Sequence, residues 1–341
     1  MSYDNSSGVV LDHDWERMYD VKLPLVKVNR VVSYKGKEVE SREDSYGEMM
    51  FMGDIHIGHE AHSHNPFNAY VNFLKERPHI RVGLMGDYLE YAEKTNFVKN
   101  EVMGIDEQID LFIRYMKPLR DRIDFILWGN HEERFAVYTK SNRLMQGIAN
   151  EIGVGKNCYV GEPQRGVYLI VKSGKKKYGT YAHHSKTGAV VNKTFQLRRT
   201  GNNIRAALIV HGHTHHLGYE QQTVREITPS GRITRRQWLV SSGCFIKDAS
   251  YAEARSYPLN VVGAPIIRFY SDRNKLDFVD ISTDYREYIT RGGIPFAGDM
   301  TGVTDMGNVY QRRDRVVLKP VLSPSGGVAP VRGRGDNLSP L

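Results

Sequence analysis

The tetrapeptide Gly129-Asn130-His131-Glu132 follows directly on an apolar run at residues 125–128. A short apolar run that stops at glycine and polar residues is typical of a buried strand with polar side chains at its carboxyl end. In open α/β sheets, ligands bind at that end of the strands. This stretch therefore predicts a strand that presents an amide and an imidazole at a functional sheet edge.

Four other segments have the same form, each preceded by its own apolar run. Taken one at a time, such a segment is more often a turn or a solvated histidine than a site. Five of them, each at a predicted strand end, favour one shared site. The four segments are Gly53-Asp54-Ile55-His56, Gly86-Asp87, His183-His184 and Gly212-His213-Thr214-His215.

The side chains in these segments offer carboxylate oxygen, amide oxygen and imidazole nitrogen but no thiolate. Such a mixed set suits borderline divalent ions, namely Mn, Fe, Co, Ni or Zn. The chain has only two cysteines, Cys158 and Cys244. Two are too few for a disulfide framework or a cysteine-rich zinc module, so we expect free thiols.

The order Asp-x-His, Gly-Asp, Gly-Asn-His-Glu, His, Gly-His-x-His resembles the calcineurin-like metallophosphoesterase superfamily over residues 49–216. The resemblance implies an α/β fold, with two mixed sheets packed as a sandwich and flanked by helices. It also implies phosphoester hydrolysis with two divalent metal ions. Mn is the ion we expect first, with Fe, Zn, Ni and Co as alternatives.

Carried over position by position, the resemblance implies two ligand sets that share Asp87 as a bridging carboxylate. One ion would be held by Asp54, His56, Asp87 and His215, and the other by Asp87, Asn130, His183 and His213. A hydroxide shared by the two ions would attack phosphorus.

His131 would stay off the metals and protonate or stabilise the leaving oxygen. In the pair His183-His184 only one ring would face the site. We choose His183, the first residue after the predicted strand. His184 and His216 remain candidates for contacts behind the ligands.

Positive charge gathers in one block of the chain. The whole chain carries +8, whereas residues 164–236 hold fourteen Lys or Arg against two Glu, so the remainder is net negative. So many cations around two metal motifs favour a polynucleotide, DNA or RNA, as substrate. The residues we expect to bind it are Arg134, Lys186, Arg198 and Arg199.

Three other functions stay open at this point. The basic block would also suit a phosphatase acting on protein or small-molecule monoesters, or a small-nucleotide phosphodiesterase, where it would serve only steering or solubility. A non-enzymatic binding scaffold is the third. All seven ligand positions and His131 are filled, which favours an enzyme.

The 341 residues predict a globular chain with one catalytic domain. We divide it into an N-terminal extension (1–47), the catalytic domain (48–282), a C-terminal extension (283–318) and a flexible tail (319–341). The sequence shows neither a signal peptide nor a run of 18 apolar residues, so we expect a cytoplasmic protein without a membrane span. Helices are predicted from Asn65-Pro66, and over 105–119, 131–152 and 190–199. A hairpin is predicted over 166–182, and strands over 221–228, 232–240, 264–270 and 275–281.

Overall fold

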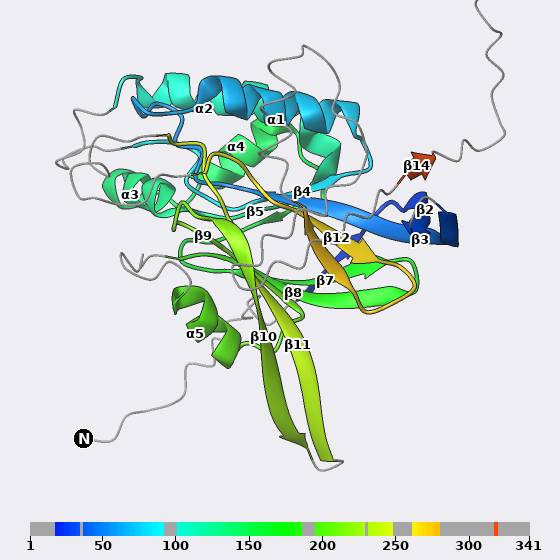
Figure 1. The fold of residues 1–341 in the computed structure, drawn as a ribbon. Coiled ribbons are helices and arrows are strands. Elements are labelled where there is room, and N and C mark those ends of the chain that lie inside the picture. Colours follow the sequence, from blue (N-terminus) through cyan, green and yellow to red (C-terminus); the bar gives the residue numbers. More distant parts are fainter. Residues whose placement is uncertain are drawn as a thin grey trace, which may run out of the picture.

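Two β-sheets pack face to face, with helices on both outer faces (Figure 1). The structure is a computed structural model, and it describes residues 18–34, 37–91, 101–185, 195–228, 231–247, 261–279 and 317–319. Both sheets contain parallel and antiparallel neighbours. The predicted fold class, two mixed sheets sandwiched between helices, is therefore confirmed.

Sheet B carries the first three predicted motif strands side by side. Its order is β13 (Leu276–Val279), β12 (Ile266–Tyr270), β3 (Lys37–Met52), β4 (Arg81–Leu84), β5 (Ile123–Ile126) and β6 (Tyr159–Val160). β2 (Val26–Tyr34) pairs with β3, and β14 (Val317–Lys319) pairs with β2. The strands β3, β4, β5 and β6 are parallel, so their carboxyl ends lie at one edge.

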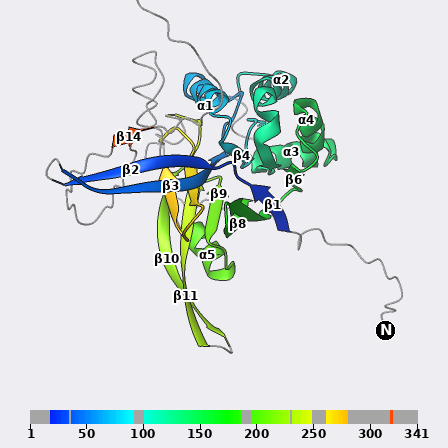
Figure 2. The ribbon, with the colours of Figure 1, turned by 90° about the vertical axis from the view of Figure 1, so that its right-hand side faces the viewer.

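Sheet A carries the other two motif strands. Its order is β1 (Met18–Lys22), β7 (Val167–Ser173), β8 (Lys176–His184), β9 (Leu208–Gly212), β11 (Gly231–Ser242) and β10 (Leu217–Thr228). β8 and β9 are parallel, whereas β10 and β11 form a long antiparallel hairpin. In Figures 1 and 2 this hairpin reaches well beyond the body of the protein.

Among the described residues, four α-helices cover sheet B and one covers sheet A (Figure 1). The first four are α1 (His64–Glu76), α2 (Ile105–Met116), α3 (Asn130–Thr139) and α4 (Leu144–Ile152), and the fifth is α5 (Phe195–Asn203). Along β3 the side chains alternate between the two faces of the sheet. Met50 and Met52 pack under the helices, whereas Met49 and Phe51 pack between the sheets. Because its side chains alternate, β3 contributes both to the core under the helices and to the core between the sheets.

Three helices differ from their predicted bounds. The helix predicted over 105–119 ends at Met116, and a 3₁₀-helix, η3 (Lys117–Arg122), follows it. The expected helix 131–152 is two helices, because Lys140 adopts a left-handed conformation (φ 53°) that ends α3. α5 runs to Asn203, four residues beyond its predicted end, and Gly201 lies within it. The predicted N-terminal part of that helix, 190–194, lies outside the described residues.

The N-terminal extension contributes strands to both sheets. β1 pairs in parallel with β7 in sheet A, and β2 pairs with β3 in sheet B. The domain bounds themselves stay a prediction. The flexible tail and the C-terminal extension lie outside the described residues, except for Val317–Lys319.

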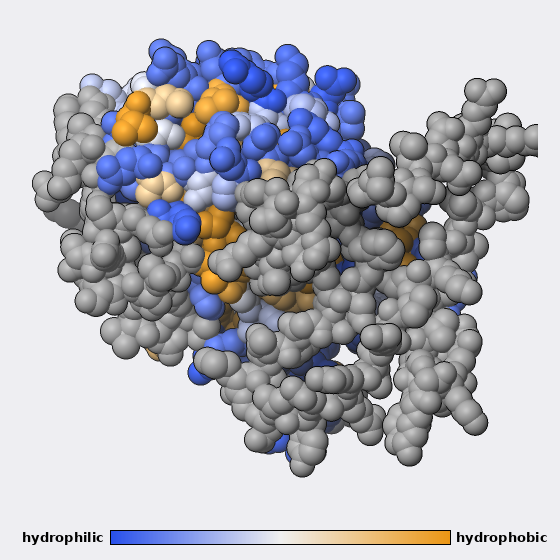
Figure 3. Space-filling model, turned by 45° about the horizontal axis from the view of Figure 1, so that its top comes forward, coloured by the Kyte–Doolittle hydropathy of each residue, from blue (hydrophilic) through white to orange (hydrophobic). Residues whose placement is uncertain are grey.

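The surface over the helices is mainly hydrophilic, with small separate hydrophobic groups (Figure 3). Among the described helices, none combines the length and the apolar character that crossing a bilayer requires.

Phe125 tests the inter-sheet core. Its ring is fully buried and lies 6.2 Å from the ring of Phe51. We expect Phe125→Ala to lower the free energy of unfolding by about 3–5 kcal/mol, measured by urea denaturation, because it leaves a cavity. Phe195→Ala is the matched control, since Phe195 is 53% exposed. An equal loss in both variants would contradict this assignment of the core.

Candidate metal centre

The loops after β3, β4, β5, β8 and β9 meet at one end of the sandwich. Within sheet B, the Asp54 N–H donates to the Gly86 carbonyl over 2.9 Å. Across the two sheets, the His213 N–H donates to the Asp54 carboxylate, 2.9 Å from Oδ2. The five polar segments therefore share one edge, as their strand ends predict.

The backbone of these loops is unusual at the ligand positions. Among the described residues, seven that are not glycine have a positive φ, and five of the seven are predicted metal ligands. Left-handed conformations of this kind are uncommon outside glycine and gather at functional sites. The five are Asp54 (φ 48°), His56 (φ 52°), Asp87 (φ 51°), His213 (φ 82°) and His215 (φ 50°).

Glycines let the loops come this close. A Cβ on Gly129 would lie 2.1 Å from both the backbone nitrogen and Oδ1 of Asp87. Gly86 has a positive φ of 96°, and a Cβ added to it would lie 2.8 Å from His184 Nδ1. No other residue fits at either position without moving the side chains of the cluster.

One group of side chains consists of Asp54, His56 and His215, whose ligand atoms all lie within 4.8 Å of one another. His56 Nε2 is 3.1 Å from His215 Nε2, and His215 Nε2 is 3.3 Å from Asp54 Oδ1. Asp54 and His56 are buried. These are three of the four residues that we predicted for the first ion.

A second group consists of Asp87, His184 and His213, again within 4.8 Å. Asn130 completes it: its amide oxygen is 3.2 Å from His184 Nε2, and the same end of the amide is 2.6 Å from His213 Nδ1. Asp87 Oδ2 lies 3.2 Å from His184 Nε2 in this group and 3.9 Å from His56 Nε2 in the first. Asp87 therefore lies between the two groups, where a bridging carboxylate is expected.

The structure places His184, and not the predicted His183, in the cluster. Side chains alternate along β8, and Tyr178, Thr180, Ala182 and His184 form its buried face. His183 is on the opposite face, where its ring stacks on Tyr181 with centroids 6.0 Å apart. The structure therefore favours His184 over the predicted His183, because the strand continues through both residues.

The donor set fits divalent cations. Around the Asn130 amide the lone pairs of carboxylate, amide and imidazole atoms converge, which a cation satisfies. Burial lowers the pKa of His56 and of His213, and a neutral imidazole is the form that binds metal. Burial lowers the pKa of His184, but the Asp87 and Asp54 carboxylates and the Met85 carbonyl together outweigh it and raise this pKa to about 10. A proton and a metal ion would compete for its Nε2.

His131 lies beside the first group, with its ring 4.6 Å from that of His56. Its Nδ1 is 2.8 Å from the Glu90 carbonyl oxygen and donates to it, which directs Nε2 away from that carbonyl. Burial lowers the pKa of His131 to about 4, so the ring is neutral. Arg134 Nη1 lies 3.5 Å from His131 Nε2, and Arg134 itself is exposed. Both residues are thus beside the cluster, as predicted.

Two buried glutamates support the cluster, and the motifs assign a role to neither. Glu90 Oε2 lies 2.8 Å from His56 Nδ1, which turns Nε2 of that ring toward the other ligands. Glu132 accepts hydrogen bonds from four backbone N–H groups, of Gly129, Asp87, Tyr88 and Leu89. Glu132 carries a readable signal, a glutamate three residues after the helix N-cap at Gly129. Glu90 has no comparable signal.

The other predicted substrate residues are placed less favourably. Arg198 pairs with Glu220 through two bonds, of 2.7 and 3.1 Å, so its guanidinium is already bound. Arg199 lines a separate cavity of about 310 Å³ together with His183 and His211. Lys186 lies outside the described residues.

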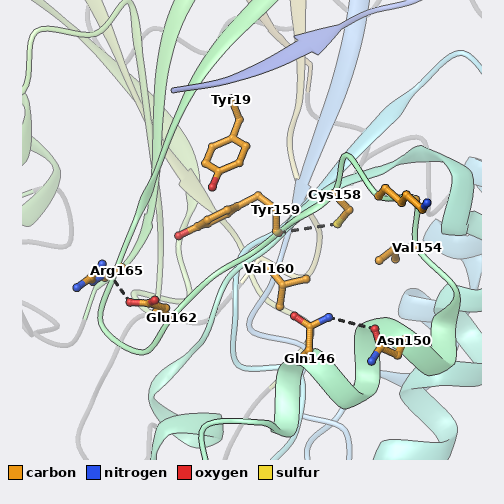
Figure 4. Close-up of a pocket in the computed structure, with 11 residues that line it drawn as sticks. Tyr19, Gln146, Asn150, Val154, Cys158, Tyr159, Val160, Glu162 and Arg165 are labelled. Atoms are coloured by element: carbon orange, nitrogen blue, oxygen red, sulfur yellow. Dashed lines mark hydrogen bonds and ion pairs between the residues drawn. The ribbon is translucent and has the colours of Figure 1, made fainter. Parts of the chain in front are cut away.

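A further cavity of about 500 Å³ opens between β1, α4 and β6 (Figure 4). Tyr19 and Tyr159 line it, with ring centroids 4.5 Å apart. Cys158 also faces it, and burial raises the pKa of this thiol to about 12, so it stays protonated. Since no predicted ligand lines this cavity, the cluster at the strand ends is the candidate site.

No family model matches the chain, and no curated protein matches it. Solved structures do match. The phosphoesterase Yfce from E. coli aligns at 12% identity and TM-score 0.37, over 70% of this chain and 94% of that one. Wild-type Vps29 from Entamoeba histolytica, complexed with zinc, aligns at 11% and 0.31, over 68% and 96%.

A metallophosphoesterase from Sphaerobacter thermophilus aligns at 14% identity and TM-score 0.29, over 73% of this chain and 95% of that one. The resemblance to the calcineurin-like metallophosphoesterase superfamily rests on the motifs and on the geometry of the cluster.

The adjacent histidines of β8 give a matched test of the ligand set. We expect His184→Ala to weaken Mn²⁺ binding at least tenfold in titration calorimetry, because it removes a donor atom from the second group. His183→Ala should leave the affinity within twofold, because that ring is on the other face of the strand. The reverse result would restore the original choice of His183.

Proposed function

We propose that this protein is a metal-dependent phosphoester hydrolase with two divalent ions, preferably Mn, at the strand-end cluster. The observation that carries the proposal is the convergence of carboxylate, amide and imidazole side chains from five strand-end loops, with five of these residues in left-handed conformations. Strained backbone of this kind persists where the surrounding structure fixes it for function. The proposed ligands are Asp54, His56, Asp87, Asn130, His184, His213 and His215.

Ions held there would supply Lewis acidity and a nucleophilic water of lowered pKa. The chain's own groups then provide orientation and proton transfer. His131 donates its Nδ1–H to the Glu90 carbonyl, so the neutral ring presents an unprotonated Nε2 to the site. Nε2 would take up a proton from solvent as the anionic phosphoester binds beside it, and would then give that proton to the leaving oxygen. Arg134, one helical turn away, would bind a non-bridging phosphoryl oxygen.

The start of α3 adds a further electrostatic contribution. Asn130 is the first residue of this helix, and the His131 N–H donates to Asp87 Oδ1 over 2.9 Å. The partial positive charge of a helix N-terminus favours anions within the first turn. It would therefore stabilise both the Asp87 carboxylate and a phosphoester bound beside it.

Metal removal and two substitutions test the reaction. We expect a chelator to abolish hydrolysis of bis(p-nitrophenyl) phosphate and added Mn²⁺ to restore it. His131→Ala should keep both ions, while kcat falls by about 10²- to 10⁴-fold, because a positioned acid is lost. Asp87→Ala should instead empty at least one ion site.

His64→Ala is the control, since this exposed histidine bonds to Tyr115 and is not part of the cluster. Activity that survives chelation would contradict metal dependence. Equal metal loss in the His131 and Asp87 variants would show that His131 is a ligand. Bound ions with no hydrolysis of any phosphoester would favour a binding scaffold.

For the substrate we propose a polynucleotide phosphodiester. The basic block of residues 164–236 supports it, because several successive phosphates use more cations than one phosphomonoester does. With Arg198 paired to Glu220, the arginines of the β10–β11 hairpin and Lys175, Lys176 and Lys177 at the β7–β8 turn remain as the cationic surface. A phosphatase or a small-nucleotide phosphodiesterase is the alternative.

A side-by-side assay decides between these substrates. With Mn²⁺ present, we expect DNA or RNA to be cleaved with a higher kcat/KM than a cyclic nucleotide or a phosphomonoester. The advantage should shrink steeply between 50 and 200 mM salt, because counterion release favours binding only at low salt. A preference for the monoester that does not change with salt would assign the site to a phosphatase.

A further inference from the structure

The β10–β11 hairpin continues well past the sheet from which it starts (Figures 1 and 2). β11 pairs with β9 only over Trp238–Ser241, so residues 231–237 pair with β10 alone. We call the two-stranded part, residues 221–228 and 231–237, the arm. At about 3.4 Å per residue the arm is about 24 Å long.

The two faces of the arm differ in charge and exposure. The register pairs Thr223 with Arg236, Arg225 with Thr234, and Ile227 with Arg232. Cross-strand partners point to the same side, so these positions and Gln221 form one face. Every residue of this face is exposed, none is acidic, and Ile227 near the tip is 91% exposed. We call it the arginine face.

The other face turns toward α5. Gln237 is buried there, its amide nitrogen donates to the Ile204 carbonyl over 2.7 Å, and Gln222 bonds to it. Arg235 belongs to this second face, although it is the immediate neighbour of Arg236. One step along the strand therefore separates an arginine of the open face from one of the α5 face.

The three arginines of the open face are spaced to bind an external anion. None of them faces another arginine across the strands, since their partners are two threonines and an isoleucine. Within the part of the chain that the structure describes, Arg225, Arg232 and Arg236 form no ion pair. Guanidinium groups that are not held in an ion pair can bind phosphate oxygens or the major-groove edge of guanine through two N–H groups.

At its root the arm packs against β13 and continues into the loop of the proposed metal site. Tyr219 stacks on Trp238 with centroids 5.0 Å apart and packs on Phe278 at 4.8 Å. β10 begins two residues after His215, and the Gly243 N–H donates to the His216 carbonyl over 2.9 Å. A ligand held by the arm is thereby linked to the loop that carries two proposed metal ligands.

We propose that the arginine face of the arm binds duplex DNA in its major groove. This inference deepens the proposed function. Cleavage of the bound duplex rests on that proposal, whereas binding of the duplex does not. A two-stranded ribbon fits the major groove of B-DNA, about 12 Å wide, and 24 Å spans about two-thirds of a turn. Within the arm the arginine face has no aromatic residue, and Trp238, which follows on the same side at the root, is half-buried and stacked on Tyr219. This disfavours a single strand, whose bases stack on free aromatic rings. Duplex RNA is disfavoured because its major groove is too narrow.

Adjacent arginines provide the matched test. The probe is a fluorescent 24-base-pair DNA duplex, titrated by anisotropy with the full-length protein in EDTA, so that no cleavage interferes. We expect Arg236→Gln to weaken binding about tenfold at 50 mM salt. The double variant Arg225→Gln/Arg236→Gln should lower the slope of log K against log salt by about 2, since each lost phosphate contact contributes about 0.9. Arg235→Gln should bind like the wild type.

The inference is overturned if Arg235→Gln loses as much affinity as Arg236→Gln, or if neither loses any. Equal binding of a duplex RNA of the same sequence would exclude the groove. A fall in oligomeric mass in the arm variants, measured by light scattering, would show that the arm joins copies of the chain instead. Hydrolysis of bis(p-nitrophenyl) phosphate separates the two proposals. A wild-type protein that binds the DNA duplex through the arm but does not hydrolyse this substrate would refute the hydrolase and leave the DNA-binding proposal intact.

Discussion

The Glu132 carboxylate is the contact on which the site most depends. Its two oxygens accept the N–H groups of Asp87, Tyr88 and Leu89 on the loop after β4, and that of Gly129 before α3. A buried carboxylate without such donors would cost several kcal/mol. The four bonds fix the Asp87 loop against the start of α3. This places Asp87 and Asn130 side by side without using either of their side chains.

The two sheets are joined at the same place by a second carboxylate. Asp54 follows β3 in sheet B and accepts the backbone N–H of His213 from sheet A. The site is therefore assembled across the sandwich, and each sheet supplies only part of it. Slippage of one sheet over the other would separate the two groups of side chains, so the inter-sheet core around Phe51 and Phe125 also maintains the spacing of the ligands.

Much of this architecture was readable from the sequence, because the motif strands are short apolar runs that end in glycine and polar residues. Their parallel order then brings Asp54, Asp87 and Asn130 to one edge. The structure favours His184 over the predicted His183, because β8 ends two residues later than predicted. The break at Lys140 was missed because tertiary context, and not local propensity, decides a left-handed residue within a helical pattern. Glu90 was missed because its partner His56 is 34 residues away.

The left-handed conformation of five proposed ligands has a consequence for how this site can change over evolution. Aspartate, asparagine and histidine tolerate positive φ better than most other residues, so the backbone itself favours the side chains that bind the metals. Replacing Asp54 or Asp87 by glutamate would keep the charge but meet a conformational penalty, and a β-branched residue would meet a larger one. The loops thus restrict the metal-binding side chains at these positions to a few residue types. Selection for another metal would have to act through the residues behind the ligands, such as Glu90, before it could act on the ligands themselves.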